Sequence, residues 1–456
     1  MARQGEKIYL DRLPSLVVEN ILQHLDLKAI KNLRLSCRYL GELCIGPRFK
    51  SFYHSRTKTD LSEESLKSLC ALASHARLGP SVKKLTIVAK VYDLTKVKEN
   101  LSARLYRDLV RTDPAPPLRR KIGINPTMEL LGMQSELEWL QTQRVGLPHG
   151  LVIDSLVSAM RAFKTLESII LRVEIVQERN VVIKDLRVGD FPGNWRRASQ
   201  VYWLTMTAVA RSGILVDKLN VYSQIVRPRI PTSCITAQIM NLDAADRLDF
   251  PGKLIKSLEI GISPEAIGGF NTKILAGQNG HGIAKLLELL PNLETLNIRQ
   301  CPDMMIYKRL QEDRILEEVT QVVHLPSLKR CSWSHMFFAK ETMLQFLNKY
   351  SQLEHLALRN VGFTSASQNW TPIFVHLSNN MPALTFLSLS TLQPRDVNLD
   401  PEWSDPFREM PSHWYDEYTG GGRMILTQEF GAEEIKQGLK FRPPPHGRPV
   451  WEDDFF

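Results

Sequence analysis

The stretch Pro291-Asn292-Leu293-Glu294-Thr295-Leu296-Asn297-Ile298 decides the fold of this chain. It places Leu293, Leu296 and Ile298 at the spacing of a turn followed by a short strand with alternating apolar residues. The same pattern recurs at 326–333, 352–358 and 382–389, and in looser form at 82–87, 166–171, 216–221 and 253–260. Because one such strand cannot bury its own apolar side, eight copies predict neighbouring strands that share a single core.

The central apolar residue of each copy marks the repeat, and the marks are Leu85, Ile169, Leu219, Leu258, Leu296, Cys331, Leu356 and Leu387. Successive marks lie 84, 50, 39, 38, 35, 25 and 31 residues apart. The later separations fit one strand plus one helix, and the first is long enough to contain an insertion or a degenerate copy. Apolar residues at helical spacing precede the later strands at 283–290, 314–323, 342–347 and 373–377. The expected fold class is therefore α/β, with parallel strands backed by helices.

This arrangement resembles the leucine-rich repeat family in an irregular, long-repeat form that covers residues 60–392. The resemblance implies a horseshoe-shaped solenoid with parallel strands on the concave face and helices outside. We expect insertions near 90–150, 173–200 and 223–252. Within the second of these, alternating apolar residues over 172–191 predict a hairpin after the second strand.

The first fifty residues have a different pattern, which predicts three short helices. Pro14 suits a first helical turn, Asp26 can cap a second helix, and a third helical run covers 36–43 before Gly46-Pro47. A unit of about forty residues is too small to bury its surface well alone, so it tends to keep apolar residues for a partner.

Four motifs in this stretch resemble the F-box family, and they predict an F-box at residues 8–50. They are Leu13-Pro14, Ile21-Leu22-Gln23-His24-Leu25, Ile30-Lys31-Asn32-Leu33 and Cys37-Arg38-Tyr39. Leu16 stands where the family usually has an acidic residue, and Tyr39 stands where it usually has Trp. The resemblance implies docking on a Skp-family adaptor through Leu13, Pro14, Val17, Val18, Ile21, Leu22, Leu25, Ile30, Leu33, Cys37 and Tyr39. The alternative is that these helices only cap the first repeat.

The charge is unevenly distributed along the 456 residues, whose net charge is +9. Residues 1–60 carry +5, residues 395–456 carry −6, and the part between them carries +10. A basic middle suits an acidic partner, such as a phosphorylated protein or nucleic acid. The alternative is that solvated lysines are spread over the helical side, since no block of five or more Lys or Arg occurs.

The compartment follows from the cysteines and the apolar runs. Six cysteines lack the paired spacing of a zinc site or a disulfide framework. Neither a signal-peptide pattern nor an apolar run of membrane-spanning length occurs, so no membrane association is expected. We expect a reducing environment, that is, a cytoplasmic and/or nuclear protein.

The sequence contains no recognisable catalytic, metal-binding or cofactor-binding motif, so we expect a protein that is not an enzyme. Residues 393–456 form an acidic tail rich in Trp, Pro and Gly. Because plain disorder is normally poor in aromatic residues, we expect this tail to pack back over the open edge of the last strand.

Candidate target-binding residues lie between the apolar anchors of the strands, because successive side chains point to opposite faces. Aromatic and Arg residues dominate binding energies, which selects Tyr222, Arg299, Arg330, Arg359 and Phe386.

Together the two resemblances imply a substrate receptor of a Skp–cullin–F-box ubiquitin ligase. The F-box would bind the adaptor and, through it, a cullin, and the repeats would bind an unknown target protein for degradation. The first alternative is a leucine-rich-repeat scaffold outside ubiquitin ligation. The second is a nucleic-acid-binding module that uses the basic middle, although nucleic acid is the less expected partner.

Overall fold

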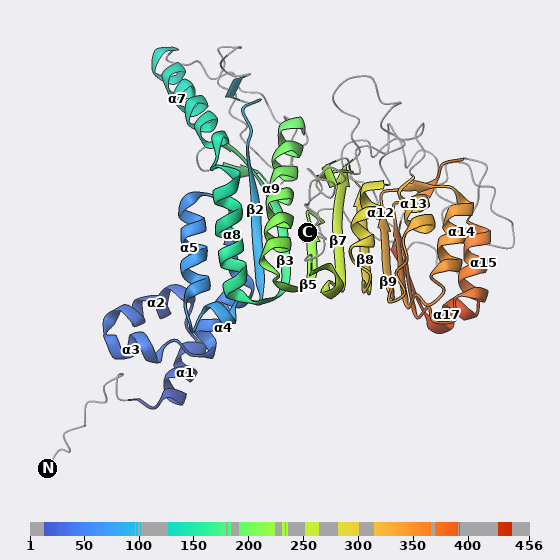
Figure 1. Ribbon diagram of the computed structural model, residues 1–456, viewed down its shortest axis with the longest axis horizontal. Coiled ribbons are helices and arrows are strands. Elements are labelled where there is room, and N and C mark those ends of the chain that lie inside the picture. Colours follow the sequence, from blue (N-terminus) through green and yellow to red (C-terminus); the bar gives the residue numbers. More distant parts are fainter. Residues whose placement is uncertain are drawn as a thin grey trace, which may run out of the picture.

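The computed structural model describes residues 13–95, 97–98, 101, 126–178, 181–183, 191–223, 230–232, 234–235, 251–263, 281–300, 314–365, 370–390, 392 and 427–439. These residues form a small helical unit at the N-terminus, followed by a sheet that is largely parallel and is backed by helices (Figure 1).

The N-terminal unit contains four helices, one more than the sequence predicts. They are α1 (Ser15–Gln23), α2 (Leu27–Ser36), α3 (Arg38–Leu43) and α4 (Pro47–Arg56). The third helix ends before Gly46-Pro47, as the sequence predicts, and this pair then begins the additional helix α4, because Pro is favourable in the first turn of a helix. Strand β1 (Thr57–Thr59) follows α4 directly, so no linker separates the helical unit from the sheet.

The main sheet follows sequence order along the path β1-β2-β3-β5-β7-β8-β9-β11-β13-β14. Neighbours along this path are parallel until the last pair, β13 and β14, which is antiparallel. The strands after β1 are β2 (Lys84–Tyr92), β3 (Thr165–Glu178), β5 (Leu215–Val221), β7 (Ser257–Ser263), β8 (Thr295–Gln300), β9 (Arg330–Ser334), β11 (His355–Arg359), β13 (Phe386–Ser390) and β14 (Thr427–Gly431).

Helices between the strands form one layer against the sheet. They are α5 (Glu63–Ser74), α8 (His149–Phe163), α9 (Phe191–Ser212), α12 (His281–Glu288), α13 (Ile315–Val322), α14 (Lys340–Lys349) and α15 (Thr371–Asn380). Neighbouring helices pack on one another, α5 on α8, α8 on α9, and α12 through α15 in succession. The four helices predicted before the later strands are therefore confirmed, as α12, α13, α14 and α15.

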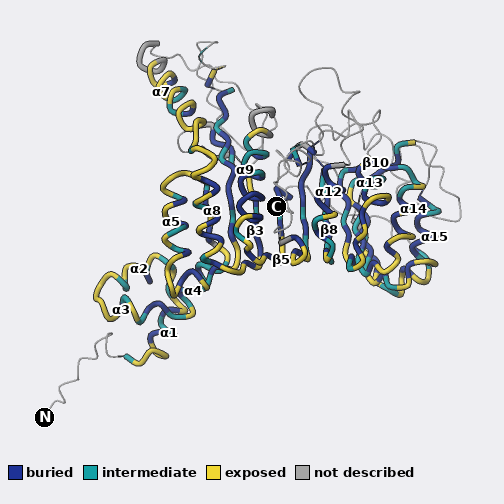
Figure 2. Tube along the Cα trace, viewed as in Figure 1, coloured by how far each residue is buried: buried dark blue, intermediate teal, exposed yellow. Residues whose placement is uncertain are grey.

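All eight sequence marks lie in one continuous row across the sheet. Leu85 pairs with Ile169, and the row continues through Leu219, Leu258, Leu296, Cys331, Leu356 and Leu387. Each marked side chain is at most 4% exposed, and all eight belong to one core cluster beneath the helix layer. Figure 2 shows the strands as largely buried and the outer surfaces of the helices as exposed. The repeats are therefore in register with one another, which the sequence spacing alone does not specify.

The first long interval contains an insertion between adjacent strands, because β2 pairs directly with β3. The described part of this interval includes α7 (Pro126–Val145) and α8. The hairpin predicted at 172–191 is confirmed, since β4 (Val181–Ile183) pairs antiparallel with the end of β3. Residues 191–200, expected within that insertion, belong instead to α9 of the helix layer.

Several smaller elements complete the described structure. They are η2 (Gly79–Ser81), β6 (Ile230–Pro231), η3 (Pro251–Leu254), the two-stranded parallel sheet of β10 (Phe337–Phe338) and β12 (Gly362–Phe363), and α17 (Ala432–Lys436). Most of the predicted insertion at 223–252 lies outside the described residues. In the tail, β14 covers the edge of β13, as the sequence predicts for this segment, and the rest of 393–456 apart from 427–439 lies outside the description.

Candidate interaction surfaces

The N-terminal unit has a small core of its own. Its buried members are Val18, Leu22, Ile30, Leu40, Cys44, Ile45, Phe49, Phe52 and Leu78. Tyr53 and Leu72 border both this cluster and the main core. The unit is thus packed against the beginning of the sheet rather than folded apart from it.

Short-range hydrogen bonds fix the helix ends of this unit. The Asp26 carboxylate accepts from the backbone N–H of Ala29 at 2.7 Å and caps α2. Cys37 has extended backbone that separates α2 from α3, and its sulfur accepts from the N–H of Leu40 at 3.4 Å. Cys37 therefore has a local capping role, in addition to an exposed position.

Cationic side chains hold the fourth helix in place. Arg34 of α2 lies over the Phe49 ring of α4 at 4.4 Å from its centroid, and Arg48 of α4 donates to the carbonyl oxygen of Leu25 at 3.5 Å. Arg77, beyond α5, pairs with Glu42 at 2.8 Å and donates to the carbonyl oxygen of Ile45 at 3.3 Å. These contacts give the helical unit a defined orientation on the sheet.

Two places on this unit expose large apolar side chains to solvent. At the start of α1, Leu16 is 73% exposed and Val17 is 41% exposed; at the junction of α2 and α3, Leu35 is 84% exposed and Tyr39 is 54% exposed. Isolated exposed apolar residues are ordinary, but four on a unit of this size indicate surface reserved for a partner. We call these four residues the exposed apolar set.

The structure corrects part of the predicted adaptor surface. Val18, Leu22 and Ile30 are at most 1% exposed and form the unit's own core, so they are not available to a partner. Of the other predicted residues, Pro14, Val17, Cys37 and Tyr39 are exposed, and Leu13, Ile21, Leu25 and Leu33 are half-buried.

Sequence reasoning missed Leu16 and Leu35. Leu35 is five residues from Ile30, which places it about 140° around the helix from the buried stripe. That offset predicts an exposed leucine. Leu16 stands at a position that is normally acidic and solvated in the F-box family, and an apolar residue at such a position itself indicates an exposed leucine.

A second candidate surface is the face of the sheet opposite the helix layer, which we call the second face. On β8 and β11 the residues alternate between buried and more exposed positions, as a half-solvated sheet requires, whereas Ser334 at the end of β9 and Ser388 and Ser390 of β13 are buried. Arg299, Arg330, Arg359 and Phe386, predicted as target-binding residues, lie on this face of β8, β9, β11 and β13.

The registers show how these four residues are arranged. One row contains Thr295, Arg330, His355 and Phe386, and the His355 and Phe386 rings lie 5.6 Å apart. A parallel row four residues further along contains Arg299, Ser334, Arg359 and Ser390. The structure therefore brings together four residues that are spread over 88 positions of sequence.

The fifth predicted target-binding residue, Tyr222, is wrongly placed on this surface. It is fully buried, and its hydroxyl donates to the carbonyl oxygen of Ala198 in α9 at 3.0 Å. The reason is the backbone: Tyr222 follows the last residue of β5 and has a φ of 54°, which ends the alternation of side chains. In β9 and β11 the same left-handed turn comes one position later, at His335 and Asn360, so Arg359 remains on the second face.

A polar network adjoins the arginines on the second face. Asn220 and Ser223 donate to the Glu259 carboxylate at 2.8 and 3.0 Å, and Arg299 donates to the carbonyl oxygen of Ser223 at 3.3 Å. Glu259 thus has its hydrogen bonds satisfied locally, and Arg299 is tied to the same cluster.

A half-buried ion pair lies near the other end of the sheet. Lys90 and Asp60 are 2.5 Å apart, and Ser62 donates to the Asp60 carboxylate at 2.6 Å. Burial acts to raise the pKa of Asp60, but the hydrogen bonds from Lys90 and Ser62 outweigh burial and lower it to about 2. This geometry is typical of a structural pair, since the hydrogen bonds favour the charged form throughout the physiological range.

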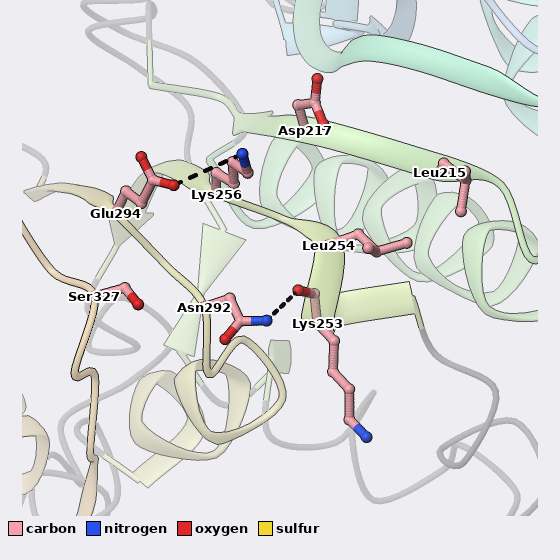
Figure 3. Close-up of a pocket in the computed structure, with 8 residues that line it drawn as sticks. All are labelled: Leu215, Asp217, Lys253, Leu254, Lys256, Asn292, Glu294 and Ser327. Atoms are coloured by element: carbon pink, nitrogen blue, oxygen red, sulfur yellow. Dashed lines mark hydrogen bonds and ion pairs between the residues drawn. The ribbon is translucent and has the colours of Figure 1, made fainter.

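The depression in Figure 3 lies where β5, β7 and β8 begin, and it has a volume of about 420 Å³. Asn292 donates to the carbonyl oxygen of Lys253 at 2.7 Å, and Lys256 lies 3.8 Å from Glu294. Lys83–Glu167 and Lys329–Glu354 form ion pairs at equivalent positions before other strands. The depression is therefore part of a recurring turn, and its polar groups serve the repeat.

Within the described ranges, no group of three or more His, Cys, Asp or Glu residues is placed to hold a metal ion. Likewise, no helix in the described part of the chain is both long and apolar enough to cross a membrane.

Comparison with known families identifies the N-terminal unit. A model of the F-box domain matches residues 10–52, which cover α1 through most of α4. The chain therefore contains an F-box domain, shifted by two residues from the predicted 8–50. F-box domains typically bind Skp-family adaptors, and the proteins that carry them are typically non-catalytic subunits of ubiquitin ligases. A comparison with curated proteins found no match.

Proposed function

We propose that this protein is a substrate receptor of a Skp–cullin–F-box ubiquitin ligase. The F-box domain would bind a Skp-family adaptor through the exposed apolar set, and the second face of the sheet would bind the target. The observation that carries this proposal is the matched F-box domain, which has a complete core yet leaves Leu16, Val17, Leu35 and Tyr39 in solvent.

We further propose that residues 57–390 are a leucine-rich-repeat horseshoe of irregular period. The proposal is supported by the unbroken row of marked residues from Leu85 to Leu387 and by helices that pack in sequence order. Such arrays use one long face for recognition, because each repeat adds a strand to the same surface.

The proposed mechanism is positioning, with the bond-forming chemistry supplied by other subunits. The receptor would hold a target near the ubiquitin carrier, which raises the effective concentration of target lysines at the reacting centre. A rigid connection serves this task, and the direct continuation of α4 into β1 supplies one.

The decisive experiment is co-purification of the full chain with a Skp-family adaptor. We expect the double substitution Leu35→Asp/Tyr39→Asp to abolish the complex, because it places two charges in an apolar interface. Leu16→Asp/Val17→Asp tests the other exposed pair in the same way. Circular dichroism and thermal unfolding of each variant should match the unsubstituted protein, since all four side chains are already in solvent.

The matched control is Ser68→Asp/Ala71→Asp on α5, which adds the same two charges at exposed positions outside the F-box domain. It should retain the adaptor. If the unsubstituted, folded protein fails to bind a Skp-family adaptor, the helical unit is a cap of the array and the scaffold alternative becomes the better account.

A further inference from the structure

We propose that the second face of β8, β9, β11 and β13 binds an anionic peptide segment of the target through Arg330 and Arg359, with Arg299 beside them. This inference rests on the proposed function and specifies the chemistry of the target at that surface. The three arginines, with His355 and Phe386, are called the arginine patch.

The first argument is charge that has no internal partner. Arg330 and Arg359 are exposed. Neither guanidinium forms a hydrogen bond or an ion pair with any residue that the structure describes. Second-face positions on β8, β9, β11 and β13 contain no carboxylate. An arginine kept on a recognition surface without a partner is the usual means of binding carboxylates and phosphates in bidentate geometry.

The second argument is convergence. Ser332 lies two residues after Arg330 on β9. It pairs with Asn297 of β8 and with Ala357 of β11. Arg299 lies two residues after Asn297, and Arg359 lies two residues after Ala357. Strand geometry places the three arginine Cα atoms roughly 7–8 Å from that of Ser332. An arginine side chain spans a comparable length, so Arg330 and Arg359 can reach one anionic group above Ser332, while Arg299 donates to the carbonyl oxygen of Ser223 beside them.

The third argument is the size of the side chains in the row between the arginines. The residues in the middle row are small or short: Asn297, Ser332, Ala357 and Ser388. Asn297, Ser332 and Ala357 are half-buried and leave room for a peptide main chain over β8, β9 and β11, whereas Ser388 is buried.

The extent of the patch favours a short anionic segment over nucleic acid. On one side the row of Asn297 continues to Glu259 of β7, and on the other side Ser388 pairs with the exposed Glu429 of β14. A long polyanion lying across the sheet would meet a carboxylate at each side. A few anionic residues placed over β9 and β11 would meet neither.

The test measures fluorescence anisotropy of labelled peptides of about twelve residues with the full chain in complex with its adaptor. One peptide contains a central run of alternating Asp and Ser, a second replaces Asp by phosphoserine, and a third has Asn in place of Asp. We expect the first two to bind and the third to bind at least tenfold more weakly. The comparison of the first two distinguishes carboxylate from phosphate as the preferred anion.

The substitution Arg330→Gln/Arg359→Gln should weaken binding of the anionic peptides by about tenfold or more, because each charge-assisted hydrogen bond contributes strongly. The control Lys253→Gln/Lys285→Gln removes the same charge away from the second face and should change binding by less than about threefold. An equal loss in the control would mean that only net charge matters and would overturn the proposal.

The proposal is also overturned if neither anionic peptide binds, or if a thymidine oligonucleotide of similar length binds more tightly and is lost with the same arginine substitutions. Adaptor capture by the same protein preparations is recorded in parallel. Retained adaptor without peptide binding would reject the arginine patch alone, whereas loss of the adaptor would reject the proposed ligase role.

Discussion

The Glu19 carboxylate accepts a hydrogen bond from the backbone N–H of Arg48 at 2.5 Å, across 29 residues of sequence. This N–H lies in the first turn of α4, where backbone donors are unsatisfied and the helix dipole favours negative charge. Gly46 allows the approach, because a Cβ at that position would collide with the Glu19 carboxylate. One side chain of α1 thereby fixes the start of the helix that continues into the sheet.

Glu19→Ala should lower the free energy of unfolding by about 1–2 kcal/mol, which is the usual cost of losing a helix cap. Asn20→Ala, at the exposed neighbouring position, should change it by less than about 0.5 kcal/mol. Urea unfolding followed by circular dichroism measures both. Equal effects of the two substitutions would contradict a capping role for Glu19.

Leu22→Ala and Leu35→Ala separate core from surface within the F-box domain. Leu22 is fully buried, so its truncation should cost about 2–5 kcal/mol, whereas Leu35→Ala should be near neutral for stability. For adaptor affinity, measured on the folded fraction of each variant, we expect the opposite order: Leu35→Ala should weaken binding more than Leu22→Ala. Thermal unfolding and adaptor titration of the same two variants test this, and a stable Leu22→Ala protein would refute the core assignment.

Asp60 should make stability depend on pH in the acid range. Its folded pKa of about 2 lies below the ordinary value, so its contribution is fully present above about pH 4 and is lost as the pH falls towards 2. We expect Asp60→Asn to cost about 2 kcal/mol at pH 7 and clearly less at pH 3. Urea unfolding at both pH values provides the measurement, and a cost that does not change with pH would contradict it.

Cys37 should report on adaptor binding. It is exposed beside Tyr39, whereas Cys44 and Cys331 are buried, and burial raises the pKa of both buried thiols. Iodoacetamide should therefore modify Cys37 much faster than Cys44 or Cys331 in the free chain. Bound adaptor should slow the modification of Cys37 by about tenfold or more, as followed by mass spectrometry of digests. Unchanged labelling of Cys37 in the complex would place the adaptor elsewhere.

Removal of residues 1–50 should destabilise the sheet as well as remove the F-box domain. The cut falls inside α4 and uncovers Tyr53, Leu72 and Leu78, which pack against the helical unit. We expect a lower unfolding temperature and aggregation, measured by light scattering. The truncation therefore does not distinguish a ligase receptor from a capped scaffold, whereas the Asp substitutions at Leu35 and Tyr39 do. A monodisperse truncated protein with an unchanged unfolding temperature would contradict this packing.

The strand pattern was the part of the fold that sequence could predict. Alternation around Leu296 and its equivalents is set by burial of one face, so the positions of the strands and of the helices before them follow from local residues. The number of residues between strands carries no such constraint. Sequence therefore left open whether another strand lies between Leu85 and Ile169, which the pairing of β2 with β3 excludes.

The candidate surfaces were less predictable, because they depend on where regular alternation stops. Strand alternation predicts Tyr222 on the second face only if β5 continues one residue further, and a positive φ at a tyrosine is not indicated by its residue type. Val18 and Leu22 were assigned to a partner because a short helical segment gives no indication that α4 will return Phe49 and Phe52 to cover them. Arg299, Arg330 and Arg359 were correctly located on strands, but their proximity follows only from the registers.

Because α4 continues directly into β1, the position of each strand relative to the F-box domain is fixed by the number of strands between them. Adjacent strands are separated by about 4.8 Å, and β9 is the sixth neighbour from β1, so the arginine patch is roughly 30 Å along the sheet from the F-box domain. With no flexible joint at the origin, this distance is set by the count of strands. In the proposed receptor, the distance between adaptor and bound target would therefore change only in whole increments, by the gain or loss of a strand with its helix.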